Sequence, residues 1–241
     1  MYRKKEFVTL VIGHKGASAD EPENTVAAFL RAKELGADGV EFDVRRAAGD
    51  DLVVWHDPTL PDGRVLLDHT GEQLAGAVDS LDAVLDACDG MSIVNVEIKN
   101  WVDDADFDAT LDVADAVACA LAARGPGSWP AYVVSCFHLE TIDRARAALD
   151  SIAPGVRTGW LLWGVDGVDK VVATAVERGH AALHPFFTAV TPELLDAAHA
   201  AGLTVNCWTC NDMDEVRRLA DLGIDGIITD RPADAKAALG R

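Results

Sequence analysis

The 241-residue sequence predicts an α/β protein whose single domain is a (β/α)8 TIM barrel. Two observations lead to this fold class. Short apolar, β-branched runs alternate with amphipathic stretches, a pattern typical of parallel βα units. When one short run is assigned to a hairpin, eight runs remain, and eight βα units close a TIM barrel. An open doubly wound sheet is the alternative that the same pattern allows.

Nine runs have strand character. The third run cannot lie parallel to the second, because only residues 45–51 separate them and a parallel crossover needs roughly a dozen residues. We therefore expect these two runs to form a hairpin. The nine runs cover residues 8–13, 39–44, 52–55, 93–98, 132–137, 158–163, 181–184, 204–208 and 226–229.

Helices are expected between the runs. Apolar residues at positions i, i+3, i+4 and i+7 predict helices that start near residues 81 and 168. Thr191 and Pro192 predict the N-cap and the first residue of a later helix, and Gly202 predicts its end. Residues 58–79 contain a Pro-Asp-Gly turn and mostly polar side chains. We interpret them as a long loop on the hairpin side, within one domain that spans residues 1–241.

The charge balance limits the kinds of ligand. Lysine and arginine number 21 against 40 acidic residues, which gives a formal net charge of −19. A broad nucleic-acid surface is therefore not expected, because phosphate binding draws on clustered basic side chains. An anionic substrate would need a local positive site, which a divalent cation held by carboxylates would supply. The acidity fits equally well with a generally acidic composition of the source organism.

The sequence also indicates the compartment. No segment approaches the length of a membrane span, and the apolar stretch that follows Arg3, Lys4 and Lys5 is too short for a signal-peptide core. The five cysteines are odd in number and sit in apolar runs, so a disulfide framework is not expected. Cys207 and Cys210 lie three apart in a predicted strand and face opposite sides, which argues against a redox pair. We expect a soluble, cytoplasmic protein of unspecified oligomeric state.

Charged side chains gather where the predicted strands end, which is where TIM barrels carry their active sites. Two residues that lie two apart in a strand share a face, so paired positions in one strand converge. Three carboxylates, two histidines and a lysine are therefore expected to meet at one site. They are Glu41 and Asp43 in the second run, Glu97 and Lys99 at the end of run 93–98, and His14 and His56 at two further strand ends.

Packed carboxylates repel one another unless a cation lies among them. Ligation by oxygen alone suits Mg²⁺ or Ca²⁺, so we expect Glu41, Asp43 and Glu97 to hold one of these ions. The alternative for any single carboxylate is a salt bridge to Lys99 or Arg45. Two histidines beside a metal would divide proton transfer between nucleophile and leaving group, because imidazole titrates near neutrality.

Motifs along the whole chain resemble one enzyme family. They read HKGA at 14–17, PENTVAAF at 22–29, GADGVEFDV at 36–44, VWHD at 54–57, EIK at 97–99, SCF at 135–137, WTCN at 208–211 and GIDGIITDRP at 223–232. In this order they resemble the glycerophosphodiester phosphodiesterase family. The resemblance implies a TIM barrel that uses a divalent metal, Mg²⁺ or Ca²⁺, to hydrolyse small glycerophosphodiesters to an alcohol and sn-glycerol 3-phosphate.

The resemblance also assigns residue roles by position. It implies that His14 and His56 are the acid/base pair and that Glu41, Asp43 and Glu97 are the metal ligands. Lys15 and Lys99 would contact the phosphate, and Trp208 would form a pocket wall near the glycerol. Asn24 would be the N-cap of the first helix.

Two departures from the family pattern affect the expected substrate. The family usually has arginine at the position of Lys15, and lysine keeps the charge but loses the planar fork that grips two phosphate oxygens. Residues 58–79, which follow His56 and Asp57, form a shortened insertion, which predicts a more open headgroup side. The leaving alcohol, the choice of metal and direct water attack against a cyclic phosphate intermediate are left open.

Other functions are compatible with parts of the sequence. A phosphate-ligand binding barrel with little turnover, or a related lysophospholipase D-like phosphodiesterase, would use the same residues. A Schiff-base aldolase would use Lys99, but Glu97 two residues earlier favours a charged lysine and a poor nucleophile. Among residues near strand ends, Trp101 and His184 are candidates to line the pocket, whereas Trp163 is expected to pack.

Overall fold

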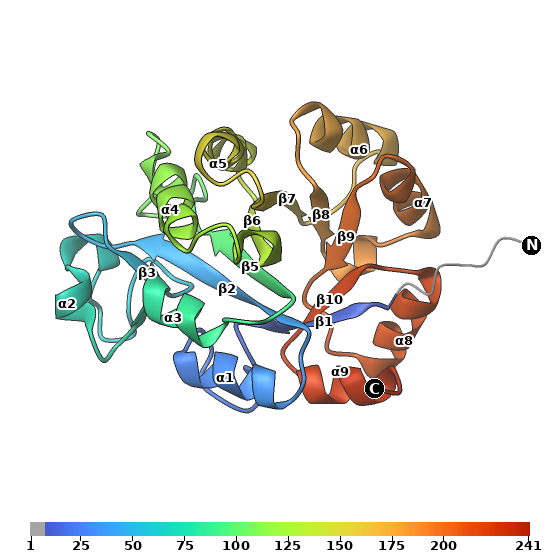
Figure 1. Cartoon of the computed structure of the whole chain (residues 1–241), viewed down its shortest axis with the longest axis horizontal. Helices are drawn as coiled ribbons and strands as arrows, with labels where there is room; N and C mark the ends of the chain where they lie inside the picture. Colours follow the sequence, from blue (N-terminus) through green and yellow to red (C-terminus); the bar gives the residue numbers. More distant parts are fainter. Residues whose placement is uncertain (1–7) are drawn as a thin grey trace, which may run out of the picture.

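Eight parallel strands close into a barrel within residues 8–241, the part of the chain that the computed structural model describes (Figure 1). Strand β1 pairs with both β2 and β10, which closes the sheet. The TIM barrel is therefore confirmed, and the open sheet is wrong. The barrel strands are β1 Leu10–His14, β2 Gly39–Arg46, β5 Ile93–Ile98, β6 Tyr132–Cys136, β7 Arg157–Leu162, β8 Ala182–Pro185, β9 Thr204–Cys207 and β10 Gly226–Thr229.

Each barrel strand is followed by a helix on the outside. In Figure 1, α4 to α7 lie on one side of the strands, and α1, α3, α8 and α9 lie on the other. Among residues 8–241, no helix combines the length and apolar character needed to cross a membrane. These helices are α1 Val26–Glu34, α3 Leu81–Ala87, α4 Asp112–Ala123, α5 Leu139–Ile152, α6 Val168–Glu177, α7 Pro192–Ala200, α8 Met213–Leu222 and α9 Pro232–Ala238.

The predicted helix signals act as expected at α7. The hydroxyl of Thr191 accepts a hydrogen bond from the Leu194 backbone at 3.1 Å, and Pro192 occupies the first turn, where its missing N–H costs nothing. Gly202 lies beyond the last turn with a φ of 80°, a backbone conformation that favours glycine. The periodic starts at α3 and α6 are also confirmed.

The N-cap of α1 differs from the prediction. The cap is Thr25, whose hydroxyl accepts from the Ala28 backbone at 3.2 Å, so the assignment of Asn24 is wrong. Asn24 instead has a φ of 58° and turns inward, where its amide donates to Asp43 at 2.8 Å. Asparagine tolerates this left-handed backbone better than most residues. The residue therefore supports the carboxylate cluster, not the helix.

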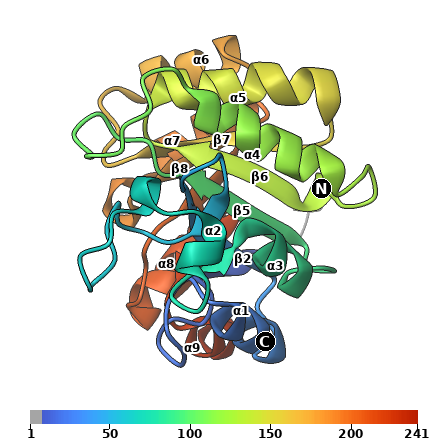
Figure 2. The ribbon, with the colours of Figure 1, turned by 90° about the vertical axis from the view of Figure 1, so that its left-hand side faces the viewer.

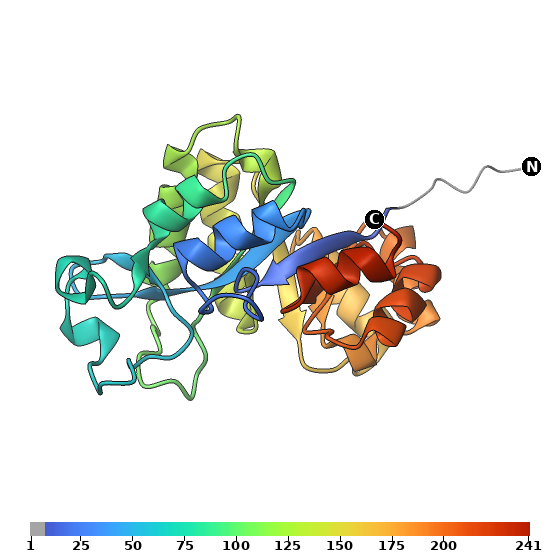
Figure 3. The ribbon, with the colours of Figure 1, turned by 90° about the horizontal axis from the view of Figure 1, so that it is seen from below.

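The hairpin is present and extends the barrel at one edge. Strand β3, Leu52–Val54, runs antiparallel to β2, and β4, Asp79–Ser80, pairs with β3. The extension lies at the left of Figure 1, faces the viewer in Figure 2, and projects away from α8 and α9 in Figure 3. Pairing continues just beyond β3, where the Trp55 N–H donates to the Asp43 carbonyl at 3.0 Å. The next residue, His56, therefore lies at the barrel mouth beside the end of β2.

Residues 58–79 contain more regular secondary structure than the predicted loop. They contain the short 3-10 helix η1, Leu66–Asp68, and the helix α2, Gly71–Leu74, whose N-terminus carries a capping box between Thr70 and Gln73. The apolar side chains are too sparse to show helical periodicity in the sequence. Three of them, Leu60, Leu66 and Leu74, nevertheless form a small core with Ala47 and Val53.

The main core lies between the strands and the outer helices, and the barrel interior has its own small apolar cluster. Ile12, Ile93, Val133 and Ile228 pack together there. Ile12 lies two residues before His14, and Ile93 four before Glu97, so the apolar cluster and the charged groups share the inward faces of their strands. The interior is therefore apolar at one end and polar at the mouth.

Removing an aromatic ring from the outer core tests this packing. Phe29 of α1 and Phe42 of β2 are fully buried with ring centroids 5.4 Å apart. We expect Phe29→Ala to lower the free energy of unfolding by about 3–5 kcal/mol, because it removes buried area and leaves a cavity. Leu30→Ala, on the exposed side of the same helix, should change it by less than about 1 kcal/mol. Urea unfolding followed by circular dichroism measures both, and equal losses would contradict the packing described.

Candidate active site

A pocket of about 420 Å³ opens at the C-terminal ends of the barrel strands. Seven of the eight sequence-predicted site residues line it: His14, Lys15, Asp43, His56, Glu97, Lys99 and Trp208. The eighth, Glu41, lies just below the lining, where its carboxylate is 3.9 Å from the His14 imidazole and accepts from the Lys15 backbone at 3.1 Å. The predicted residues therefore come together, from β1, β2, the hairpin, β5 and β9.

Three carboxylates meet at the bottom of this pocket. Strand register places Asp43 directly opposite Glu97, and Glu41 lies two residues earlier on the same face of β2. Oxygens from all three lie within 4.8 Å of one another, and all three residues are buried. Burial and the charge of Asp43 raise the pKa of Glu41 to about 8, and burial also raises the pKa of Glu97. The three carboxylates therefore cannot all ionise together unless positive charge compensates them.

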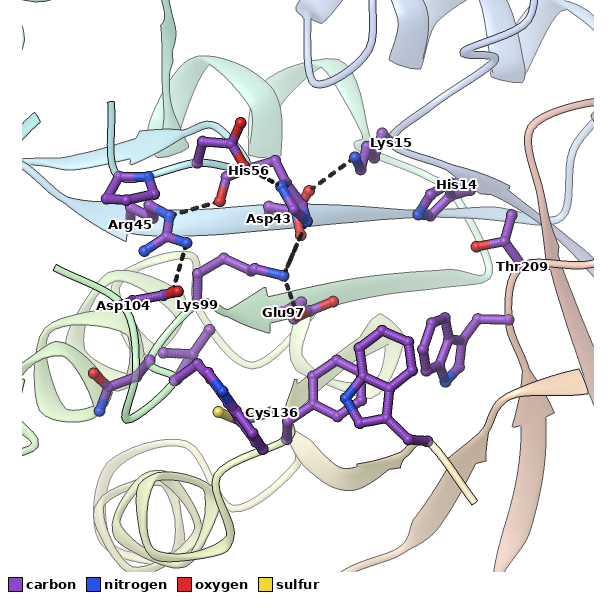
Figure 4. Close-up of a pocket in the computed structure, with 18 residues that line it drawn as sticks. His14, Lys15, Asp43, Arg45, His56, Glu97, Lys99, Asp104, Cys136 and Thr209 are labelled. Atoms are coloured by element: carbon purple, nitrogen blue, oxygen red, sulfur yellow. Dashed lines mark hydrogen bonds and ion pairs between the residues drawn. The ribbon is translucent and has the colours of Figure 1, made fainter. Parts of the chain in front are cut away.

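Two lysines offset part of that charge. The Lys99 ammonium lies 2.8 Å from Glu97 and 3.6 Å from Asp43 (Figure 4). The Lys15 ammonium lies 3.1 Å from Glu23 and 4.0 Å from Asp43. Although burial raises the pKa of Asp43, the charges of Lys99 and Lys15 and the hydrogen bond from Asn24 help to lower it overall. Burial alone would lower the Lys99 pKa, but Glu97 and Asp43 raise it, so this lysine stays protonated.

The donor set fits a divalent cation. Among the described residues, Oε1 of Glu41 is one of the few buried side-chain oxygens with no hydrogen-bond partner. An unpartnered carboxylate oxygen is costly in the interior, and a hard cation ligated by oxygen removes that cost. Glu41, Asp43 and Glu97 offer only oxygen, the ligand type that Mg²⁺ and Ca²⁺ prefer. The residues present therefore suit such an ion.

His14 has a carboxylate partner that the sequence reading missed. Its Nδ1 donates to Asp230 at 2.6 Å, and Asp230 is held in turn by Asn211 at 2.5 Å and by Ser18 at 3.1 Å. Burial alone would lower the His14 pKa, but the bond to Asp230 and the charge of Glu41 raise it overall. His14 is thus fixed in orientation and favoured in its protonated form, with Nε2 directed to Glu41.

His56 has a different environment. Its Nδ1 bonds to Asp57 at 2.7 Å, and its Nε2 lies 3.3 Å from the Lys99 ammonium. An ammonium group only donates, so Nε2 accepts from it, and the proton of the neutral ring sits on Nδ1. His56 therefore presents an unprotonated nitrogen toward the pocket, whereas His14 presents a ring favoured as a cation.

Arg45 holds the His56 side of the pocket. Its buried guanidinium donates to the His56 carbonyl at 2.6 Å and pairs with Asp104 and Asp106 in the segment after β5. It does not pair with the carboxylate trio, so the alternative of an Arg45 salt bridge there is wrong. One side chain thus ties together β2, the hairpin end and the segment that carries Trp101 (Figure 4 labels Arg45 and Asp104).

Aromatic residues form the opposite wall. Phe137, Trp163 and Trp208 each follow directly after a barrel strand, β6, β7 and β9, and Trp101 comes three residues after β5. All four line the pocket, as proposed for Trp208 and Trp101. Trp163 packs against Phe137 at 5.0 Å, as expected, but it is also 65 % exposed and forms part of the pocket wall. An aromatic residue follows a strand directly at Phe137, Trp163 and Trp208, and this repeat in the sequence would have indicated that Trp163 lines the pocket.

His184 does not line the pocket. It is fully buried in the barrel interior, where Nε2 accepts from Asn206 at 3.1 Å, and burial lowers its pKa to about 3. A Cβ on Gly159 would come within 2.8 Å of this ring, so the glycine on β7 makes room for the histidine. His184 is therefore a neutral structural residue, and the expectation of a pocket position is wrong.

Comparisons with known proteins show the family of this chain. The model of the glycerophosphoryl diester phosphodiesterase family matches residues 14–234. A glycerophosphodiester phosphodiesterase of Caldanaerobacter subterraneus subsp. tengcongensis is 31 % identical over 93 % of this chain and 95 % of its own length.

Solved structures are similar in fold. The crystal structure of a Thermotoga maritima glycerophosphodiester phosphodiesterase is 27 % identical, with a TM-score of 0.76 over 96 % of this chain and 98 % of that one. A structure from Silicibacter pomeroyi DSS-3 is 26 % identical, with a TM-score of 0.79 over 96 % and 93 %. The family match spans every strand end that builds the pocket, and the chain belongs to the glycerophosphoryl diester phosphodiesterase family.

Proposed function

We propose that this phosphoric diester hydrolase cleaves small glycerophosphodiesters to an alcohol and sn-glycerol 3-phosphate by metal-assisted catalysis with two histidines. One observation carries the proposal: three buried carboxylates, two histidines and two lysines meet in one pocket at the barrel mouth. The relatives' named activity supports the substrate class. The five unpaired cysteines fit a reducing compartment such as the cytoplasm.

Charge determines where the phosphate binds. A phosphodiester is anionic, and the lysine ammonium groups of Lys15 and Lys99 line the pocket above Asp43 and Glu97. A cation held by Glu41, Asp43 and Glu97, Mg²⁺ or Ca²⁺, would supply Lewis-acid neutralisation of the phosphate oxygens. The two lysines orient the diester and add positive charge where negative charge develops during attack.

The histidines take opposite roles. His56 presents an unprotonated Nε2 and removes a proton from the attacking oxygen, whether this belongs to water or to a glycerol hydroxyl of the substrate. His14, kept protonated by Asp230, donates a proton from Nε2 to the leaving alcohol oxygen. One bond from phosphorus to the leaving oxygen breaks, one to the attacking oxygen forms, and the proton taken at His56 balances the proton given at His14.

The alternatives differ in specific contacts. A binding barrel with little turnover would not need a histidine with a carboxylate partner at each side of the pocket, yet both pairs are present. A Schiff-base aldolase needs an unprotonated lysine, whereas Glu97 and Asp43 keep Lys99 charged. A lysophospholipase D-like reaction would use the same machinery on a substrate with an acyl chain.

Removing the cation should abolish the activity. We expect a chelator to stop release of glycerol 3-phosphate, and Mg²⁺ or Ca²⁺ to restore it, because the cation would neutralise negative charge on the phosphate oxygens during attack. Glu97→Gln should weaken metal binding, measured directly by calorimetry, as well as turnover. Full activity in chelator, after dialysis to remove bound ions, would contradict the metal-assisted mechanism.

The histidine pair should be essential. His14→Ala and His56→Ala are each expected to lower kcat by about 10²–10⁴-fold, the usual contribution of a positioned acid or base. His69→Gln serves as the matched control, because this histidine lies in the 58–79 segment and bonds the Val65 carbonyl away from the pocket. The roles assigned here would be wrong if both alanine variants kept full activity in a product assay.

The pH profile should report the carboxylate behind His14. Asp230 stabilises the imidazolium and so raises the His14 pKa, and an amide at this position removes that stabilisation. We therefore expect Asp230→Asn to shift the alkaline limb of the kcat profile to lower pH, since the general acid loses its proton earlier. Asp57→Asn should leave that limb in place. An unchanged alkaline limb in the Asp230 variant would show that His14 is not the group that must stay protonated.

A further inference from the structure

The pocket separates positive and aromatic groups by depth. The lysines that face the phosphate are deep, with side chains 11 % exposed at Lys15 and 14 % at Lys99. The guanidinium of Arg45, also in the lining, is buried and paired. The exposed lining residues are instead Trp163 at 65 %, Trp101 at 40 % and Asp57, whose side chain is 68 % exposed and lies beside the 43 % exposed side chain of His56. Within residues 8–241, no lysine or arginine of the lining reaches the rim.

The aromatic groups at the rim are held in place by one another. Trp163 stacks on Phe137 with an interplanar angle of 16°, so one face of its indole is covered and the other faces outward. Trp208 meets the edges of both rings at 5.3 and 4.9 Å, and Trp101 meets Phe137 at 6.2 Å. The exposed indole of Trp163 is held by two other rings, so little side-chain entropy is lost when a ligand covers it.

We propose that this rim is a leaving-group subsite that selects a quaternary ammonium alcohol over neutral alcohols. The proposal rests on the function proposed above, which places the anionic phosphate at the deep lysines. A zwitterionic substrate complements such a pocket, because its anionic phosphate lies at the deep lysines and its cationic group lies at the outer end. The outward face of Trp163 attracts a cation that is too methylated to donate hydrogen bonds, and Trp101 and the Asp57 carboxylate line the same pocket.

The proposal assigns each arm of the diester a place in the pocket. With the phosphate at Lys99, it places the choline nitrogen, two carbons beyond the ester oxygen, at the mouth of the same pocket. Glycerol, the other arm, is a small polyol that gains little from an exposed indole. The deeper Trp208, whose Nε1 donates to the His184 carbonyl at 2.7 Å, serves as its wall.

A charge-free isostere tests the proposal. We compare kcat/KM for sn-glycero-3-phosphocholine with that for the matching 3,3-dimethylbutyl diester, in which carbon replaces the nitrogen and only the charge is lost. The wild type should prefer the choline ester by about fivefold, the size of a partly exposed cation–π contact. Trp163→Leu should bring that ratio close to one, and Trp163→Phe should retain part of it, because phenylalanine keeps a ring face.

The controls separate this proposal from the wider one. Val176→Ala, an exposed apolar position on α6 after the same strand, should keep the full preference for choline. Equal rates on the two diesters in the wild type, or a preference that survives Trp163→Leu, would overturn the subsite. Glycerophosphoglycerol tests the proposed function by itself, because it carries no ammonium group. If no diester is cleaved, that function fails, and calorimetric binding of the choline ester against its isostere still decides the subsite.

Discussion

The burial of three carboxylates at one end of the barrel is the constraint on which the rest of the site depends. Like charges within a few ångströms in a poorly solvated space cannot all ionise without compensation. Each neighbouring cation therefore has a structural as well as a chemical role. Lys99 compensates Glu97 and Asp43, and His14 lies next to Glu41; in the proposed function, a divalent cation would bring the remaining positive charge.

The fold concentrates these charges because of its topology. Parallel register sets Asp43 against Glu97, and the return of the chain through β3 brings His56 to the end of β2. A crossover helix at this point would have carried residue 56 to a different strand position. The hairpin therefore explains why the second histidine lies beside the carboxylates, and Arg45 fixes that return by bonding the His56 carbonyl.

The sequence was sufficient to predict the parts of the site that depend on local periodicity. The alternation of strand faces was enough to pair Glu41 with Asp43 and Glu97 with Lys99, and the short gap before Leu52 was enough to predict the hairpin. It could not find Asp230, because the contact of this residue with His14 exists only once β10 closes against β1, 216 residues away in the chain. Asn24 was misassigned for a related reason: its side chain donates a hydrogen bond to the buried carboxylate of Asp43 on β2 and does not cap the helix that follows.

The replacement of the family's usual arginine by Lys15 can now be given a physical meaning. Residue 15 does two separate things. Its backbone, with a φ of 54°, turns the chain so that its N–H donates to Glu41, and this contact does not depend on the side chain. Its ammonium, shared between Glu23 and Asp43, supplies a single point of charge instead of a planar fork. The substitution therefore leaves the backbone contact to Glu41 intact and changes the shape of the positive group beside Glu23 and Asp43. In the proposed function this weakens the grip on the phosphate, so specificity depends more on the other end of the substrate, where the pocket offers aromatic rings.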